Sequence, residues 1–317
     1  MGEPPMTLAD LREEELLARI IPLLPTAAPG VLVGPGDDTA VLACRGATIV
    51  TTDAAVRDRD WRDDWCSGAD VGAKIVAQNL ADVAAMGGRP TGLVVTLLAD
   101  PRTTVAWVED FARGLGEAAR AAEAVVLGGD LSSAPAGLLA VSVTALGELD
   151  GRDPVLRSGA RVGDRVAVAG TLGRSAAGLV LLEQGRSDVD PELVAMHRRP
   201  TPPLAQGPVA ALAGARAMLD LSDGLLRDAA RIAAASGVRL DLDRAALARY
   251  AARLAPAVGD AGSWECVLGG GEEHSLLACF PGPVPEGWTV VGSVHEGAGV
   301  SVDGIRQSPR GWDHFRV

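Results

Sequence analysis

Lysine is almost absent from this sequence, because Lys74 is the only one among 317 residues. A Walker A loop ends in Gly-Lys, whereas Lys74 follows Ala73 inside a predicted helix, so that class of phosphate-binding loop is excluded. A protein that handles phosphate with so little lysine must neutralise charge through arginine, backbone N–H groups and divalent metal ions. Aspartate carboxylates suit hard cations of the magnesium kind. The positions of the aspartates therefore carry the most information.

Several common motifs are also missing. The four histidines show no metal-ligand spacing, and the chain contains neither G-x-S-x-G nor H-E-x-x-H. The Gly-Pro-Gly turn at 34–36 lacks the third glycine of a dinucleotide-binding fingerprint. The four cysteines form no C-x-x-C pair and are too sparse for a secreted disulfide scaffold. We therefore expect reduced thiols in a cytoplasmic protein.

The charge balance restricts the partners. The chain carries 29 Lys+Arg against 41 Asp+Glu, a formal net charge of −12. This charge disfavours a nucleic-acid backbone or an anionic membrane surface as a partner. We expect no signal peptide, and no apolar run reaches the ~18 residues of a membrane-spanning helix. An anionic substrate would have to arrive together with its metal ion.

The pattern of apolar residues predicts an α/β or α+β protein. Strand-like runs rich in valine and leucine alternate with alanine-rich helical stretches, and the length favours two domains over one. The turn-rich stretch at 147–151 divides the chain, which gives domains of residues 1–148 and 149–317. Helices are expected over 70–86, 104–122, 175–184, 204–213, 224–236 and 244–254.

Acidic residues gather at the predicted strand ends of the first domain. Asp37 and Asp38 follow the Gly-Pro-Gly turn, and Asp53 ends the run TIVTTD beside two threonines. Carboxylates at strand ends point into the crevice where open α/β sheets bind ligands. Asp82 lies three residues after Asn79 in a predicted helix, so both side chains project from one face.

Two further motifs combine glycine or serine with aspartate. Two glycines at 128–129 precede Asp130, and their missing side chains let a ligand approach the backbone. Asp220 and Asp223 bracket Ser222 at a predicted strand-to-helix turn, where free helix N–H groups suit a phosphate. Each aspartate alone is explained as a turn residue, an N-cap or an exposed charge. Convergence of all of them would require several divalent ions, because uncompensated carboxylates repel one another.

These motifs occur in the order seen in the thiamine-monophosphate kinase family, of the aminoimidazole ribonucleotide synthetase-like superfamily, which the chain resembles. The shared motifs are GDDTAVL, TTD, DVGAKIVAQNLADVAAMGGRP, GGD, RSGARVGD, SAAGL, LDLSDGL, GGGEEHSLL and GWDHF. The resemblance implies an N-terminal domain that binds ATP and magnesium and dimerises through its sheet. It also implies a C-terminal α/β domain that completes the nucleotide and substrate site between the two domains.

The implied activity is transfer of the γ-phosphate of ATP to thiamine monophosphate, giving thiamine diphosphate, with several Mg²⁺ ions in a homodimer. The positions that resemble metal ligands are Asp38, Thr51, Thr52, Asp53, Asp82, Asp130, Asp220 and Asp223. The catalytic positions, acting through metal, would be Asp53, Asp82 and Asp130. The positions that resemble ATP contacts are Gly129, Asp130, Arg157 and Ser222. The positions that resemble substrate contacts are Asp60, Glu272 and Trp312.

Two positions depart from the family pattern. The family usually has a histidine before an aromatic residue in the loop after TTD, whereas this chain has Asp60-Trp61. A carboxylate there should repel a substrate phosphate unless a metal ion or an arginine intervenes. The usual Gly-Gly-Glu-Asp ends here in Glu272-Glu273. Two alternatives stay open: another ATP-using enzyme of the superfamily, such as selenophosphate synthetase or aminoimidazole ribonucleotide synthetase, and a non-catalytic nucleotide-binding relative.

Overall fold

A computed structural model describes residues 4–36 and 39–311. The chain divides into two compact units. Unit 1 comprises Met1–Val83 and Pro90–Gly151, and unit 2 comprises Ala84–Arg89 and Arg152–Val317. The mixture of helices and strands confirms the predicted α/β (α+β) class. Over the described ranges, the model contains no helix with the length and apolar character needed to cross a membrane.

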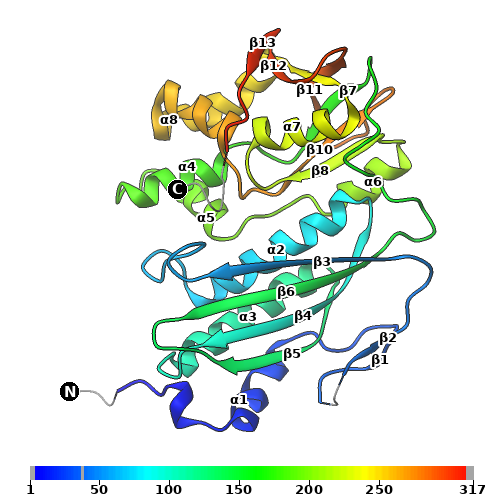
Figure 1. Ribbon diagram of the computed structural model, residues 1–317. Coiled ribbons are helices and arrows are strands. Elements are labelled where there is room, and N and C mark those ends of the chain that lie inside the picture. Colours follow the sequence, from blue (N-terminus) through cyan, green and yellow to red (C-terminus); the bar gives the residue numbers. More distant parts are fainter. Residues whose placement is uncertain (1–3, 37–38, 312–317) are drawn as a thin grey trace. The chain divides into compact units, whose positions relative to one another are not determined.

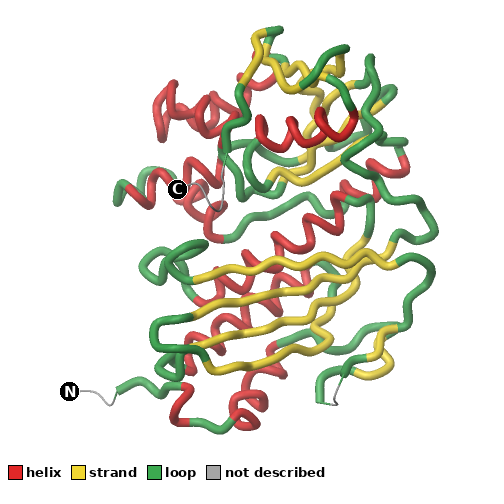
Figure 2. The backbone as a smooth tube through the Cα atoms, in the orientation of Figure 1, coloured by secondary structure: helices red, strands yellow, loops and turns green. Residues whose placement is uncertain are grey.

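Unit 1 is built on a four-stranded sheet in the order β3-β6-β4-β5 (Figure 1). Its strands are β3 (Thr48–Val56), β4 (Arg89–Ala99), β5 (Val125–Ser133) and β6 (Leu139–Glu148). β3 pairs antiparallel with β6, β4 pairs parallel with β5, and β3 and β5 form the two edges. Helices α2 (Gly68–Ala85) and α3 (Val105–Ala121) cover one face of this sheet, as the tube view shows (Figure 2).

Glycines let α2 and α3 pack closely. A Cβ at Gly72 would lie 2.3 Å from the Phe111 carbonyl oxygen, and a Cβ at Gly114 would lie 2.0 Å from the Ala69 carbonyl oxygen. No larger residue fits at these two positions without moving a helix backbone. The close packing fixes α2, which carries part of the candidate site, against α3.

The other face of the sheet is open within unit 1. Along β3, Val50, Thr52 and Ala54 are exposed, whereas Ala55 is buried, which is the alternation expected of a strand with one covered face. The Val50 side chain is 63% exposed. Val94 of β4 is also exposed, at 37%, so two apolar side chains of this sheet are open to solvent.

Short elements complete unit 1 at its N-terminal end. They are η1 (Leu8–Asp10), α1 (Glu13–Ile20), η2 (Ile21–Leu23), β1 (Val31–Val33) and β2 (Val41–Leu42). β1 and β2 form a two-stranded antiparallel sheet. The side chain and the backbone N–H of Thr7 both donate to the Asp10 carboxylate at 2.8 Å, so a capping box starts the first turn.

Unit 2 contains a seven-stranded sheet in the order β13-β12-β9-β11-β7-β10-β8. Its strands are β7 (Arg165–Ala169), β8 (Ala217–Leu221), β9 (Arg239–Leu242), β10 (Ser275–Phe280), β11 (Trp288–His295), β12 (Gly299–Val302) and β13 (Ile305–Gln307). Its helices are α4 (Arg174–Glu183), α5 (Pro191–Arg198), α6 (Gln206–Leu212), α7 (Leu225–Ser236) and α8 (Arg244–Gly269). β8 and β10 are buried along their whole length. β10 and the edge strand β8 therefore both carry residues into the core of the unit.

The last residues of α2 belong to the core of unit 2. Ala84 and Ala85 are buried in one cluster with Phe280 and Trp288. A Cβ at Gly207 in α6 would lie 2.2 Å from the Ala84 carbonyl oxygen, so the two helices touch through their backbones. The helix that carries part of the candidate site is therefore anchored at its C-terminal end as well.

Candidate active site

A polar cluster joins the middle of β3 to α2. The Thr51 hydroxyl donates to Asp82 Oδ2 at 2.8 Å, and the Asp53 backbone N–H donates to Asn79 Oδ1 at 3.1 Å. Asn79 is fully buried, and its amide group also donates to the Ile75 carbonyl at 2.8 Å. Residues two apart on a strand share a face, and residues three apart on a helix do the same. The structure thus brings Thr51, Asp53 and Asp82, three of the expected metal ligands, to one side of the sheet.

Thr52 points to the other face of the sheet. Its hydroxyl donates to the Val143 carbonyl at 3.0 Å and accepts from Thr144 Oγ1 at 3.3 Å. Because neighbouring residues in a strand alternate between faces, the Thr52 side chain is separated from that of Thr51. The structure does not place this expected ligand in the same cluster.

Asp130 lies on the edge strand β5. Its carboxylate accepts from Ser132 Oγ at 2.7 Å, and Asp130 pairs in register with Thr96 of β4. The cluster around Thr51 starts from β3, at the opposite edge of the same sheet. Within one chain, unit 1 does not bring Asp130 to that cluster.

The two glycines before Asp130 have different surroundings. A Cβ at Gly129 would lie 1.9 Å from the Val95 carbonyl oxygen, so strand packing itself requires glycine there. At Gly128 nothing lies within 4 Å of the Cβ position. Gly128 is therefore the position at which a ligand can approach the backbone of β5.

The donors of the β3–α2 cluster suit magnesium. Across residues 4–36 and 39–311, no group of three or more His, Cys, Asp or Glu side chains is arranged to hold a metal ion. Mg²⁺ needs fewer protein ligands than that, because it is bound through one or two carboxylates while water and substrate phosphates complete its octahedron. Thr51, Asp53 and Asp82 supply oxygen donors, which a hard cation prefers. The residues present fit a magnesium ion that arrives with a nucleotide.

In unit 2, Asp220 is paired with a buried histidine. Asp220 lies in β8, and its Oδ2 is 3.0 Å from Nδ1 of His274. Both side chains are buried. Strand β10 starts directly after His274 and pairs with β8, with Leu276 opposite Asp220, which brings the imidazole to the carboxylate.

Asp223 and Asp228 frame the start of α7. Asp228 Oδ2 accepts from the backbone N–H groups of Asp223 and Gly224, each at 3.0 Å. Arg231 contacts the carboxylates of both Asp223 and Asp228, and Arg227 Nε lies 3.7 Å from Asp223 Oδ2. Burial raises the pKa of Asp228 to about 7, against the opposite effect of the Arg231 charge. Asp223 is thus held through both its backbone and its side chain.

The segment before β10 brings Glu272 to Ser222. The Glu272 backbone N–H donates to the Ser222 carbonyl at 2.9 Å, and a Cβ at Gly271 would lie 2.1 Å from that oxygen. Glu272 has a φ of 62° and a carboxylate oxygen 3.5 Å from Nδ1 of the buried His197. His197 Nδ1 is also 3.2 Å from Ser175 Oγ. The expected ATP contact Ser222 and the expected substrate contact Glu272 therefore lie together.

Glu273, one of the two departures from the family pattern, is buried at the start of α4. Its Oε1 accepts from Thr171 Oγ1 at 2.6 Å, and it also accepts from the backbone N–H groups of Gly173 and Arg174. Burial raises the pKa of Glu273, and these hydrogen bonds oppose that shift. A carboxylate is favourable at a helix N-terminus, so the longer acid has a structural role here.

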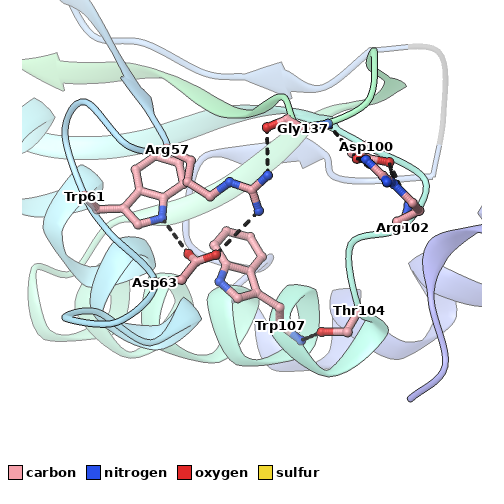
Figure 3. Close-up of polar contacts among 8 residues, drawn as sticks. All are labelled: Arg57, Trp61, Asp63, Asp100, Arg102, Thr104, Trp107 and Gly137. Atoms are coloured by element: carbon pink, nitrogen blue, oxygen red, sulfur yellow. Dashed lines mark hydrogen bonds and ion pairs between the residues drawn. The ribbon is translucent and has the colours of Figure 1, made fainter. Parts of the chain in front are cut away.

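The other departure lies in the loop at 57–65, which is anchored by an aromatic stack (Figure 3). Trp61 is buried and stacks on Trp107 with 6.2 Å between ring centroids. Asp63 accepts from Trp61 Nε1 at 3.2 Å and from Arg57 at 3.4 Å, and Arg57 also donates to the Gly137 carbonyl at 2.7 Å. The loop is tied to the rest of unit 1 at several points.

Asp60 closes a turn inside this loop. Its Oδ2 accepts from the Val56 backbone N–H at 2.7 Å. One carboxylate oxygen of the expected substrate contact is thus engaged by the chain itself.

In unit 2, Arg157 is exposed, and its carbonyl accepts from Ser236 Oγ at 3.2 Å. Two other expected site residues, Asp38 and Trp312, lie outside the described residues.

Three residues of these arrangements were not identified as partners from the sequence. The pairing of Asp228 with Arg231 could have been predicted from their spacing, because an acid and a base three residues apart face the same side of a helix, here α7. The pairing of His274 with Asp220 could not, because the two residues lie 54 positions apart and meet only through strand pairing.

Comparison with known proteins agrees with the motif order. Residues 36–149 match the family described as AIR synthase related protein, N-terminal domain, and residues 161–281 match the corresponding C-terminal domain family. Thiamine-monophosphate kinase of Mycobacterium tuberculosis (strain ATCC 25618 / H37Rv) is 47% identical over 290 residues, which cover 90% of this chain and 86% of that protein.

Two solved structures are similar over nearly the whole chain. Thiamine-monophosphate kinase from Stenotrophomonas maltophilia K279a has a TM-score of 0.79 at 30% identity, covering 93% of this chain and 96% of that chain. AaThiL complexed with AMPPCP and TMP has a TM-score of 0.78 at 32% identity, covering 96% of this chain and 99% of that chain. The chain therefore belongs to the thiamine-monophosphate kinase family of AIR synthase related proteins.

Proposed function

We propose that this chain transfers the γ-phosphate of ATP to thiamine monophosphate, which yields thiamine diphosphate and ADP. The observation that carries the proposal is the high identity with a thiamine-monophosphate kinase along most of the chain. AaThiL in complex with AMPPCP, an analogue of ATP, and TMP supports the same pair of substrates for this relative. The oxygen donors gathered on β3 and α2 supply the chemistry that such a reaction needs.

The proposed site residues divide into three groups. The proposed metal ligands are Asp38, Thr51, Thr52, Asp53, Asp82, Asp130, Asp220 and Asp223. The proposed ATP contacts are Gly129, Asp130, Arg157 and Ser222, and the proposed substrate contacts are Asp60, Glu272 and Trp312. Bound magnesium would supply positive charge between the phosphates of the two substrates. Asp53, Asp82 and Asp130 would act catalytically by holding that metal.

The chemistry places modest demands on the protein. The acceptor is a phosphate oxygen that is already an anion, so no general base is required. The difficulty lies in aligning two polyanions, which rigidly mounted ligands achieve by positioning. Asn79 and Asp228 supply such rigidity, because each is buried and holds the backbone N–H of an expected metal ligand.

We also propose a homodimer formed through the sheet of unit 1. The uncovered face with the exposed Val50 and two unpaired edge strands supports this arrangement, since a second copy would cover the apolar side chains and the edges. Residues 1–148 would then bind ATP and magnesium and form the dimer, and residues 149–317 would complete the site. The four free cysteines support a reducing, cytoplasmic location.

Release of ADP tests the proposed function. The purified protein is incubated with ATP and Mg²⁺ with thiamine monophosphate, and beside it without acceptor. Turnover that requires the acceptor is the expected result, and ATP binding without turnover would overturn the proposal. Asp130→Asn removes the charge of a proposed metal ligand, so it should abolish turnover. Because Asp130 is exposed, the circular dichroism spectrum should stay unchanged.

A further inference from the structure

Two arginines of α7 meet the carboxylate of Asp223. Arg231 contacts Asp223 Oδ2, and Arg227 Nε lies 3.7 Å from the same oxygen. The two arginines are four residues apart, so both project from one face of the helix. The Asp223 side chain is only 14% exposed, so little water screens these contacts.

Asp228 holds this arrangement in place. Its side chain is fully buried, and its Oδ1 contacts the second terminal nitrogen of Arg231. Its Oδ2 accepts from the backbone N–H groups of Asp223 and Gly224. Asp228 therefore fixes the backbone of Asp223 and, at the same time, the guanidinium that contacts the Asp223 carboxylate.

A guanidinium and a divalent cation compete for one carboxylate. Both bind the same oxygen lone pairs, and two positive groups placed at one carboxylate repel each other. Arg231 already contacts Asp223 Oδ2, so a metal ion must displace it to bind that oxygen. A phosphate group offers the displaced guanidinium a new bidentate partner, which free metal does not.

We propose that Arg231 is a positioning residue that sets the cation affinity of Asp223. It holds the Asp223 carboxylate in place and excludes free divalent cations from it. A cation that arrives with a nucleotide displaces it. The inference rests on the proposed function, because that function gives Asp223 a metal ion to bind. It predicts that the metal affinity of the protein without nucleotide is lower than its carboxylates alone would give.

The test measures Mn²⁺ binding to the full chain without nucleotide, by the loss of the free-ion signal in electron paramagnetic resonance. Arg231→Gln should lower the Kd for Mn²⁺ roughly tenfold, because a positive charge next to the carboxylate is removed. Arg231→Lys keeps the charge and should stay near the wild type. In an Asp223→Asn background, Arg231→Gln should change nothing, because the carboxylate for which the two cations compete is gone.

A matched control removes the same charge elsewhere in unit 2. Arg253 bridges two carboxylates in the same way, with Nη1 2.6 Å from Asp190 and Nη2 3.0 Å from Glu192. Arg253→Gln should leave the Mn²⁺ affinity unchanged. If Arg231→Gln does not fold, Arg231→Gln with Asp228→Asn removes both partners of this ion pair, and its Mn²⁺ affinity is compared with that of Asp228→Asn alone.

Several outcomes would overturn the inference. They are an Arg231→Gln protein that binds Mn²⁺ no tighter than the wild type or binds none, an equal effect of Arg253→Gln, and an effect that persists without the Asp223 carboxylate. These results are separable from the kinase assay. If the wild type turns over thiamine monophosphate and Arg231→Gln has an unchanged Mn²⁺ affinity, only the inference is wrong. If Arg231→Gln binds Mn²⁺ more tightly and the wild type shows no turnover, only the proposed function is wrong.

Discussion

Asp53 and Asp130 lie on opposite faces of the four-stranded sheet, on the two strands that form its edges. Asp53 shares a face with Thr51, whose hydroxyl bonds to Asp82 of α2. Asp130 pairs with Thr96, which neighbours a buried leucine and so lies on the other face. One unit 1 therefore cannot bring both carboxylates to the same metal ion. A two-fold dimer that joins β3 of one chain to β5 of the other would place the strand that carries Asp53 beside the strand that carries Asp130 of the second chain.

Subunit mixing tests this arrangement. Asp53→Asn and Asp130→Asn should each inactivate the homodimer. When the two variants are co-expressed, half of the dimers are mixed and one of their two sites is intact, so activity should return to about a quarter of the wild type. ADP release from the co-purified mixture is the measurement. Activity that stays at the level of the separate variants would show that both carboxylates act from one chain.

Gly128 and Gly129 form a matched pair for a second prediction. A Cβ at Gly129 would lie 1.9 Å from the Val95 carbonyl oxygen, whereas nothing lies within 4 Å of a Cβ at Gly128. Gly129→Ala should therefore lower the free energy of unfolding by about 1–3 kcal/mol, as overpacking does. Gly128→Ala should fold with wild-type stability and lose ATP affinity, because its methyl group occupies the approach to the backbone.

Thermal unfolding and nucleotide binding by calorimetry separate the two variants. A Gly128→Ala protein with unchanged ATP affinity would remove this part of β5 from the nucleotide site. A Gly129→Ala protein of wild-type stability would show that β4 and β5 can move apart at little cost.

Local periodicity made part of the fold and of the site predictable. The helix expected over 70–86 is α2 (Gly68–Ala85), and its spacing places Asn79 and Asp82 on one face toward β3. Thr51 and Thr52 are adjacent in sequence, and both were expected to be metal ligands. Their side chains lie on opposite faces of the sheet, because neighbouring residues in a strand alternate between faces. The pairing of His274 with Asp220 depends on the register of β10 against β8, which no local pattern encodes.

The end of α8 shows a different limit. The sequence predicted a helix over 244–254, and Pro256 and Gly259, which both disfavour helix interiors, follow it. Gly259 has a non-helical backbone with a φ of 77°, so α8 consists of two helical segments, and the second segment, which ends at Gly269, was not predicted. Buried residues beyond the kink, such as Val267, supply packing that outweighs the local preference.

Asp60 leads to a third prediction. Its Oδ2 accepts the Val56 backbone N–H, and Asn at this position keeps an oxygen for that bond while removing the negative charge. If the carboxylate faces the substrate phosphate, Asp60→Asn should lower the KM for thiamine monophosphate about threefold to tenfold and leave the KM for ATP unchanged. Asp64→Asn is the control, because Asp64 is an exposed residue of the same loop and is paired with Arg62. Equal effects of both variants, or none, would exclude Asp60 from the substrate site.

The cysteines give a prediction that depends on pH. Cys44 is exposed, whereas the other three thiols are buried. Burial raises the pKa of Cys266 to about 11 and that of Cys279 to about 12, so both stay neutral at pH 8, where a thiolate is needed for reaction. Ellman's reagent should therefore titrate one thiol rapidly in the native protein and four in denaturant, with no fast thiol in Cys44→Ser. Rapid reaction of a second thiol at pH 8 would contradict the burial of these residues.

The same two thiols make the stability depend on pH. Unfolding returns both groups to a pKa near 9. Above about pH 9 the unfolded chain therefore loses protons first, and the free energy of unfolding falls.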